Sequence, residues 1–365
     1  MAMLRQYGHE VEFYKRDNAE LMHIDKASAA AQALWSTHTR RDIADLIERF
    51  RPDVIHAHNT MPLISPSLYW AAAKGQVPVV QTLHNFRLLC PQATLLREGK
   101  VCEDCVGKVP WRGVVHACYR GSVAQTAVLA LTNTVHRAVG TWSDKVTRYI
   151  ALTDFARAKF IAGGLPAERI RVKPNFVDLP AQPEGRRDGA LFVGRLSEEK
   201  GIDTLLAAAR LLPEGLRVRV VGDGPMAKRV AAEPGIEWLG AQVSEAVYAL
   251  MRQAQVLLLP SICYDNFPRT LVEAYASSLP VMASDLGPLR DLVHNGRTGW
   301  LVPVGDAQAW ASAITNVTAR PADLRIMGRE ARRHYERELN PTSNYQRLMS
   351  IYEEALRAVG ESGHH

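Results

Sequence analysis

The sequence predicts an α/β protein of two domains, each built on a parallel β-sheet. The chain has 365 residues, roughly two to three times the usual length of one domain, and 47% of them are hydrophobic. Short β-branched runs alternate with amphipathic helical patterns along the chain, as in βαβ units. A segment rich in proline, glycine and charge, residues 179–189, separates two such series. We therefore expect an N-terminal domain at 1–180 and a second domain at 181–342.

Each strand is expected where a short β-branched run lies between turn residues. In the first series these runs are 11–14, 54–58, 77–83, 147–152 and 170–173. In the second series they are 190–193, 216–221, 256–259 and 280–283. Amphipathic helices are expected between the strands, most clearly at 201–212, 244–254 and 307–318.

A long helix is expected at the end of the chain, over residues 343–360. Pro341, Thr342 and Ser343 form a helix start signal. Apolar residues then recur at helical spacing: Tyr345, Leu348, Met349, Tyr352, Leu356 and Val359. Such a face needs an apolar partner, so the helix either completes the second domain or packs back on the first.

Charge is unevenly distributed along the chain. Residues 1–180 hold 23 Lys and Arg against 16 Asp and Glu, whereas the whole chain has a net charge of only +6. A basic half suits an anionic membrane surface or a phosphate-bearing substrate, and a merely soluble basic surface explains it equally well. No nucleic-acid-binding motif accompanies the charge, so we expect no nucleic-acid partner. With no long apolar stretch and no signal peptide, we expect a cytoplasmic protein that contacts a membrane only peripherally.

Three loops that join a strand to the next helix hold most of the candidate chemistry. Helix N-termini at the carboxyl ends of parallel strands present free N–H groups to anions. In the first loop, Arg195 and Lys200 flank a tight turn, where two cations can meet a diphosphate; the alternative is a solvated basic turn. The second loop has glycines at 222 and 224 that allow a ligand to approach the backbone, but a lone Gly-x-Gly is weak evidence.

The third loop leads into a helix that contains a carboxylate. Glu273 lies among apolar residues, so it needs a hydrogen-bonding partner. A pair of ligand hydroxyls is the partner that we favour over an internal salt bridge. Asp265 precedes the helix that Pro268 starts, and it can reach the same ligand.

In this order and spacing, the three loops resemble the C-terminal domain of family 4 retaining glycosyltransferases. That family has the GT-B architecture, in which two Rossmann-like domains face each other across a cleft. The resemblance covers nearly the whole chain. Its motifs in the first half are Gly8-His9-Glu10-Val11, the run 51–58, the run 78–85 and the run 172–178.

The resemblance implies a role for particular residues. Arg195 and Lys200 match the diphosphate-binding pair, and Glu273 matches the carboxylate that binds the donor ribose. Asp265 stands where the family has a Glu that contacts the donor sugar, and His84 matches the histidine of the N-terminal domain that orients acceptor or donor sugar. Further donor-binding positions implied by the resemblance are Gly194, Gly222, Gly240, Asn266, Phe267 and Pro268.

The resemblance implies transfer of a hexose-type sugar, with retention, from a UDP- or GDP-sugar to a glycan or a lipid-linked glycan. Fixed cations would stabilise the departing diphosphate, and the absence of an Asp-x-Asp motif argues against a catalytic metal. In two respects the sequence departs from the family: it opens inside the helix that precedes Gly8, and Asp265 is one methylene shorter than Glu. An impaired nucleotide-sugar-binding or scaffolding protein is therefore the main alternative, and a nucleotide-sugar epimerase is a weaker one.

Four cysteines form a separate cluster. Cys90, Cys102, Cys105 and Cys118 fall within 29 residues and include one C-x2-C pair, while Cys263 stands apart. In a cytoplasmic protein such a group favours a structural zinc site over disulfides. A second C-x2-C pair is missing, so reduced buried thiols are an equal alternative.

Overall fold

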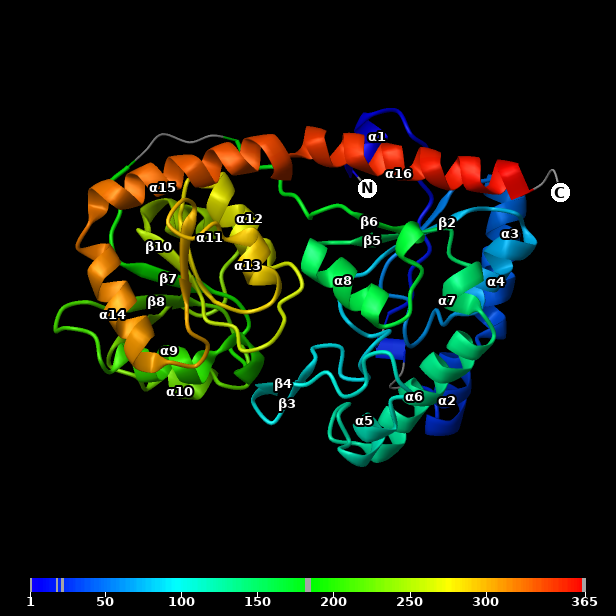
Figure 1. Cartoon of the computed structure of the whole chain (residues 1–365), viewed down its shortest axis with the longest axis horizontal. Coiled ribbons are helices and arrows are strands. Elements are labelled where there is room, and N and C mark those ends of the chain that lie inside the picture. Colours follow the sequence, from blue (N-terminus) through cyan, green and yellow to red (C-terminus); the bar gives the residue numbers. More distant parts are fainter. Residues whose placement is uncertain (1, 18, 21–22, 181–184, 363–365) are drawn as a thin grey trace. The chain divides into compact units, whose positions relative to one another are not determined.

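The computed structural model describes residues 2–17, 19–20, 23–180 and 185–362 (Figure 1). The chain divides into two compact units. The N-terminal unit comprises Met1–Leu95, Glu103–Lys173 and Tyr345–His365, and the C-terminal unit comprises Leu96–Cys102 and Pro174–Asn344. The prediction of two parallel-sheet α/β domains is confirmed.

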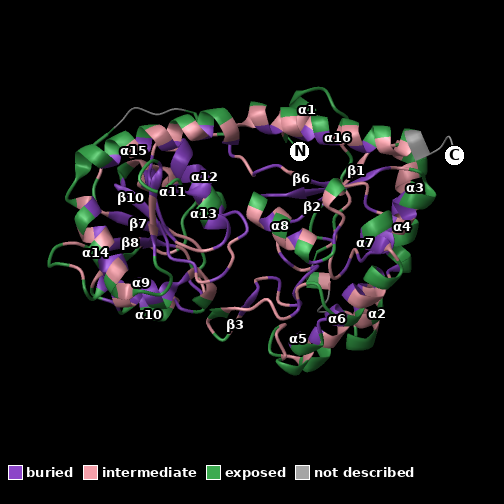
Figure 2. Cartoon of the chain, viewed as in Figure 1, coloured by how far each residue is buried: buried purple, intermediate pink, exposed green. Residues whose placement is uncertain are grey.

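The N-terminal unit is built on a four-stranded parallel sheet of order β1-β2-β5-β6. Its strands are β1 (Ile55–Ala57), β2 (Val79–Thr82), β5 (Arg148–Ala151) and β6 (Ile170–Val172). Each lies within one of the predicted runs, and buried residues gather on the strands (Figure 2). The central strands β2 and β5 are the most deeply buried, as expected for a sheet covered on both faces.

Helices of the N-terminal unit begin mainly at polar capping residues. Ser36, Ser122 and Thr153 each accept a hydrogen bond from a first-turn N–H. The helices up to residue 162 are α1 (Ala2–Gln6), α2 (Lys26–Leu34), α3 (Thr37–Phe50), α4 (Ser67–Lys74), α5 (Trp111–Val115), α6 (Val123–Ala138), α7 (Thr141–Asp144) and α8 (Asp154–Ala162).

The strand predicted at 11–14 is wrong. Val11 to Tyr14 have no strand pairing, and the sheet ends at β1. The segment is held by side chains instead: Arg5 donates to the Val11 carbonyl, and the Tyr14 hydroxyl donates to Asp42 of α3 at 2.7 Å. A β-branched, aromatic run becomes a strand only when a neighbouring strand satisfies its backbone.

The C-terminal unit is built on a six-stranded parallel sheet of order β12-β11-β10-β7-β8-β9. Its strands are β7 (Ala190–Val193), β8 (Val218–Val221), β9 (Ile236–Trp238), β10 (Val256–Leu259), β11 (Val281–Ser284) and β12 (Gly299–Val302). The sequence analysis missed the two edge strands, β9 and β12. β9 has only three residues, two of them exposed, so it lacks the continuous apolar run that marks a central strand. β12 does have an apolar run, residues 300–302, to which the sequence analysis assigned no strand.

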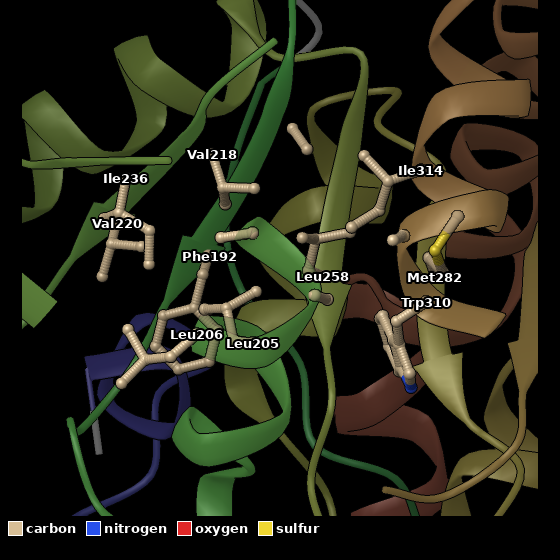
Figure 3. Packing of buried hydrophobic residues seen from close by; sticks show 14 of the residues in the cluster. Phe192, Leu205, Leu206, Val218, Val220, Ile236, Leu258, Met282, Trp310 and Ile314 are labelled. Atoms are coloured by element: carbon tan, nitrogen blue, oxygen red, sulfur yellow. The ribbon is translucent and has the colours of Figure 1, made fainter. Parts of the chain in front are cut away.

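The core of the C-terminal unit lies between the sheet and two helices. Figure 3 shows Leu205 and Leu206 of α9 (Ile202–Ala209) against Phe192 of β7, and Ile314 of α14 beside Leu258 of β10. The remaining helices are α10 (Ala227–Ala231), α11 (Ser244–Gln253), α12 (Arg269–Ala276), α13 (Pro288–Leu292), α14 (Ala307–Thr318) and α15 (Pro321–His334). A two-stranded hairpin of β3 (Leu96–Arg97) and β4 (Lys100–Val101) is grouped with this unit.

The last helix, α16 (Pro341–Ser362), belongs to the N-terminal unit from Tyr345 onward. Leu348 and Ile351 pack with Val80 and Ile150 of the N-terminal sheet. Leu356 was expected on the apolar face but is 42% exposed, because the buried stripe runs through Ile351 and Ala355 instead.

The two units separate between Lys173 and Pro174, before the boundary predicted after residue 180. Residues just after Lys173 are held by the C-terminal unit: Asn344 donates to the Pro174 carbonyl at 2.7 Å, and the Tyr335 hydroxyl donates to that of Val177 at 3.0 Å. Part of the predicted linker, residues 181–184, lies outside the described residues.

Candidate functional site

The three predicted loops follow neighbouring strands of the C-terminal sheet. β10, β7 and β8 are adjacent and parallel, so their carboxyl ends lie at one edge. The loops after Val193, Val221 and Leu259 therefore start side by side. This is the edge at which open parallel sheets bind ligands.

Glycines join the first two loops backbone to backbone. A Cβ on Gly222, whose φ is +140°, would lie 1.8 Å from the Gly194 carbonyl oxygen, and one on Gly224 would lie 2.5 Å from that of Leu196. The Gly194 and Leu196 amides donate to Val221 and Asp223 at 3.0 and 2.9 Å. The glycines of the second loop are thus required by the fold, so they need not mark a ligand.

A third glycine joins the first loop to the third. Gly201 has a φ of +73° and caps α9, and a Cβ there would lie 1.8 Å from the Pro260 carbonyl oxygen. The Ile262 amide also donates to the Glu199 carbonyl at 3.1 Å. The helix predicted near residue 202 starts at this point, next to Lys200.

Lys200 is held by a carboxylate of the third loop. Its Nζ lies 2.5 Å from Oδ2 of Asp265, which also accepts a hydrogen bond from Ser261 at 3.2 Å. Burial alone would lower the pKa of Lys200, but the charge and hydrogen bond of Asp265 outweigh it and raise that pKa. The structure brings these two predicted residues together and keeps the lysine charged.

Arg195, the other predicted cation, lies on the same loop between β7 and α9 but is exposed. Within the described ranges no ion pair of its guanidinium is recorded. The first loop therefore offers one exposed cation and one that is already paired.

Glu273 lies in α12 with 7% of its surface exposed. Its carboxylate is 2.9 Å from Nε of Arg269 and accepts a weak hydrogen bond from Tyr248 of α11 at 3.4 Å. Burial raises the pKa of Glu273, although both partners oppose this. The internal salt bridge that the sequence analysis considered less favoured is thus present, and the burial of Glu273 does not itself require a ligand.

The turn before α12 is tightly packed. Asn266 and Phe267 are each 7% exposed, and Pro268 occupies the position before the helix without capping it through a side chain. Gly240, by contrast, has open space around its missing side chain, and its carbonyl accepts a hydrogen bond from the Gly222 amide at 2.8 Å.

His84 follows β2 in the N-terminal unit and belongs to a group of three histidines. Its Nε2 lies 2.7 Å from Nδ1 of His58, and the His58 ring stacks on His56 with centroids 4.4 Å apart. Burial lowers the pKa of His84, lowers that of His58 to about 4 and lowers that of His56 further below its usual range. The sequence analysis missed His56 and His58, although their i, i+2 spacing at a strand end places them on one face.

The predicted zinc ligands are not assembled as a metal site. Cys90 and Cys105 are buried, Cys102 and Cys118 are half-buried, and the structure places none of them in a disulfide. Among the described residues, no group of three or more His, Cys, Asp or Glu side chains is arranged to hold a metal ion. Thiolates are nevertheless the ligands that structural zinc prefers. The zinc site at the four cysteines therefore stays a prediction from the sequence.

No helix in the described part of the chain is both long enough and apolar enough to cross a membrane. The two parallel-sheet α/β units have the GT-B glycosyltransferase fold. Residues 2–180 match the domain described as Glycosyltransferase Family 4, and residues 187–320 match Glycosyl transferases group 1. The chain belongs to the family 4, group 1 glycosyltransferases.

Individual relatives agree with this assignment. The amylovoran biosynthesis glycosyltransferase AmsK of Erwinia amylovora is 29% identical over 216 residues, which are 53% of each protein. The chain spans about half the length of the first curated relatives that it matches.

Solved structures share the fold. Anabaena HepE, in complex with UDP-glucose, is 18% identical with a TM-score of 0.67, over 96% of this chain and 88% of its own. Sucrose-phosphate synthase from Thermosynechococcus elongatus is 19% identical with a TM-score of 0.68, over 92% of this chain and 81% of its own.

Proposed function

We propose that this glycosyltransferase moves a hexose-type sugar, with retention, from a nucleotide diphosphate donor to a glycan or a lipid-linked glycan. The observation that carries the donor site is the position of Lys200: a charged, largely desolvated lysine lies directly before α9 at the carboxyl edge of the sheet. A cation beside helix N–H groups favours a diphosphate there. The structure of HepE in complex with UDP-glucose supports this donor class.

The leaving group explains why cations are needed. When the bond to the anomeric carbon breaks, negative charge grows on the β-phosphate. Lys200, oriented by Asp265, and the exposed Arg195 would stabilise that charge without a catalytic metal. Because Asp265 already holds Lys200, its second role toward the donor sugar would use the other carboxylate oxygen.

Glu273 would bind the ribose of the donor nucleotide. For its carboxylate to accept ribose hydroxyls, Arg269 must share it or swing away. Arg269 is 68% exposed along its side chain, so moving it disturbs little packing. His84 would then orient the acceptor or the donor sugar from the N-terminal unit, and the basic excess of that unit would favour peripheral contact with an anionic membrane.

One observation favours an alternative, a protein that binds nucleotide sugar without transferring it. Asp265, the residue proposed to contact the donor sugar, is already held by Lys200 and Ser261. A direct test separates the two functions. Thermal shift with UDP-, GDP- and ADP-sugars identifies the donor, because a ligand that binds only the folded state raises its melting temperature.

Release of the nucleoside diphosphate and the anomeric configuration of the product are then followed by NMR with candidate acceptors. Product with the donor's configuration supports retaining transfer. Binding without turnover for every donor and acceptor tested supports the alternative, and absence of nucleotide-sugar binding contradicts both.

A further inference from the structure

Arg269 is the first residue of α12, where a positive charge is unfavourable. The N-terminus of a helix is the positive end of its dipole, so acidic residues are favoured there and basic residues at the C-terminus. The first turn of α12 contains no acidic residue, and Arg269 begins it. Arg269 also precedes its partner Glu273 by one turn, which is the weaker of the two orders for an i, i+4 ion pair.

A second ion pair of the same unit shows the favourable arrangement. Arg210 caps the C-terminal end of α9, where its charge complements the dipole, and its Nε lies 2.8 Å from Oε2 of Glu233. The side chains of Arg210 and Arg269 are 66% and 68% exposed, and both pair with a buried carboxylate. Only Arg269 opposes its helix. A local stability rule that is broken without a structural gain marks a candidate for function.

The start of α12 lies close to the proposed diphosphate site. Nζ of Lys200 is 2.5 Å from Oδ2 of Asp265, and Arg269 is four residues further along the same segment. Four residues of extended chain span at most about 14 Å. A long, exposed arginine side chain at this position can therefore reach a diphosphate that binds at Lys200.

The ion pair of Arg269 has to open when the donor ribose binds. Ribose offers two neighbouring hydroxyls, which a carboxylate accepts with its two oxygens. Nε of Arg269 lies 2.9 Å from Oε1 of Glu273, and the Tyr248 hydroxyl contacts the same oxygen at 3.4 Å. A ribose on Glu273 therefore takes Oε1 from Arg269. The guanidinium is then released at the N-terminus of a helix.

A phosphate is a better partner for the released guanidinium than solvent is. The planar guanidinium donates two parallel hydrogen bonds to a phosphate, and such charge-assisted pairs are strong. An exposed ion pair such as Arg269–Glu273 is weak, so little is lost when it opens. Once the ribose hydroxyls satisfy Glu273, the move of Arg269 to the phosphate is favourable.

We propose that Arg269 is a donor-binding residue that changes partners: it holds Glu273 in the free protein and binds the diphosphate when the ribose occupies that carboxylate. The inference rests on the proposed function, because it needs a nucleotide diphosphate donor at these loops. It adds a third cation to Lys200 and Arg195. It also couples the two parts of the donor, because each part strengthens the binding of the other.

The first test is calorimetric titration of the full chain with uridine, pyrophosphate and UDP. Guanosine and GDP replace uridine and UDP if the wild type binds only GDP. Arg269→Leu removes the competitor of the ribose, so we expect nucleoside affinity to rise about twofold to fivefold. The same variant loses a phosphate-binding cation, so pyrophosphate affinity should fall about tenfold.

The second test breaks the same ion pair from its other side. Glu273→Gln frees Arg269 in advance, so pyrophosphate affinity should rise about twofold to fivefold while nucleoside affinity falls about tenfold. A purely structural role of Arg269 predicts no such gain. Arg269→Lys keeps the charge but loses the planar fork, so it should recover only part of the pyrophosphate affinity.

The matched control is Arg210→Leu. It removes an equally exposed arginine from an equally buried carboxylate of the same unit, at the end of α9 that lies away from Lys200. All three affinities should stay at the wild-type level. Thermal unfolding of each variant verifies that it is folded.

Unchanged pyrophosphate affinity in Arg269→Leu would overturn the proposal, and so would weaker pyrophosphate binding by Glu273→Gln. An equal fall of nucleoside and pyrophosphate affinity in Arg269→Leu would also overturn it, since Arg269 would then act only by holding α12. UDP binding that Lys200→Ala weakens and Arg269→Leu does not would refute this inference alone. A wild type that binds neither UDP nor GDP would refute the proposed donor site and this inference with it.

Discussion

We call the loops after Val193, Val221 and Leu259 of the C-terminal unit the donor loops, because the proposed donor site lies there. These loops and the group of His56, His58 and His84 in the N-terminal unit hold their charges in opposite ways. Lys200 in the first donor loop and Glu273 in the helix after the third are each paired with an opposite charge of the protein. In the histidine group, basic residues lie together and burial keeps the histidines neutral. The difference shows two ways to keep an ionisable group out of water: one pairs the charged group with an opposite charge, and the other lowers its pKa so that it stays neutral.

The largest expected effect is on the free energy of folding and concerns the cysteines. A metal ion bound there would add a third kind of charged site to this comparison. We predict about one structural zinc per chain, held by Cys90, Cys102, Cys105 and Cys118. Zinc binding can contribute on the order of 10 kcal/mol to folding. Elemental analysis measures it: zinc should survive Cys263→Ser and be lost with Cys105→Ser. Folded, zinc-free protein would show that the cysteines are simple buried thiols.

The second prediction tests whether the donor loops are rigid. Gly201→Ala places a Cβ 1.8 Å from the Pro260 carbonyl oxygen, so we expect it to cost about 3 kcal/mol or more of unfolding free energy. Gly240→Ala is the matched control, because Gly240 also has a positive φ but open space around it. It should cost only about 1 kcal/mol. Urea unfolding of both variants decides the matter, and equal costs would mean that the loops can separate.

The third prediction tests the ion pairs as binding groups. Lys200→Ala and Glu273→Ala should each weaken nucleoside diphosphate binding by roughly tenfold to a hundredfold, since each removes a charge-assisted hydrogen bond worth about 1.5 to 3 kcal/mol. Calorimetric titration measures the affinity. Lys228→Ala, at an exposed lysine of α10, should leave it unchanged. If both site variants bind like the wild type, the donor is not held by these loops.

The smallest effect concerns the pH dependence of stability. The folded state lowers the pKa of His58 to about 4, below its unfolded value of about 6.5. Between these values the unfolded chain binds more protons, so the free energy of unfolding should fall as the pH falls through this window. His58→Asn should flatten that dependence, as measured by urea midpoints between about pH 4 and 7. An unchanged slope would mean that His58 titrates normally.

The sequence predicted the interior of both sheets better than their edges. Val256–Leu259 and Ala190–Val193 are continuous apolar runs, and both became central strands with the predicted bounds. Ile236–Trp238 is as much a strand as they are, but its Glu and Trp are exposed at an edge and carry no such signal. Conversely, 11–14 has the composition of a strand without a partner, and pairing is a property of the fold that one segment cannot reveal.

In the candidate site, the sequence identified residues but not their partners. It placed Lys200 and Asp265 on two of the three loops and Glu273 in the helix after the third, and the order of the strands explains why these loops are neighbours. It did not indicate that Arg269 would pair with Glu273, because an i, i+4 pair on a helix forms or not according to what else reaches the carboxylate. Nor did it join His58 to His84, which lie 26 residues apart and meet only because β1 and β2 are neighbours.

The division of the chain into units also affects the order in which the units can fold during synthesis. The N-terminal unit needs Leu348, Ile351 and Ala355 to cover Val80 and Ile150, and these residues are synthesised after the C-terminal unit. During translation, part of the apolar surface of the first sheet therefore stays exposed to solvent until α16 has left the ribosome. The C-terminal unit, by contrast, has been synthesised once Asn344 is added. A nascent chain stopped before α16 would expose that surface and become a substrate for chaperones.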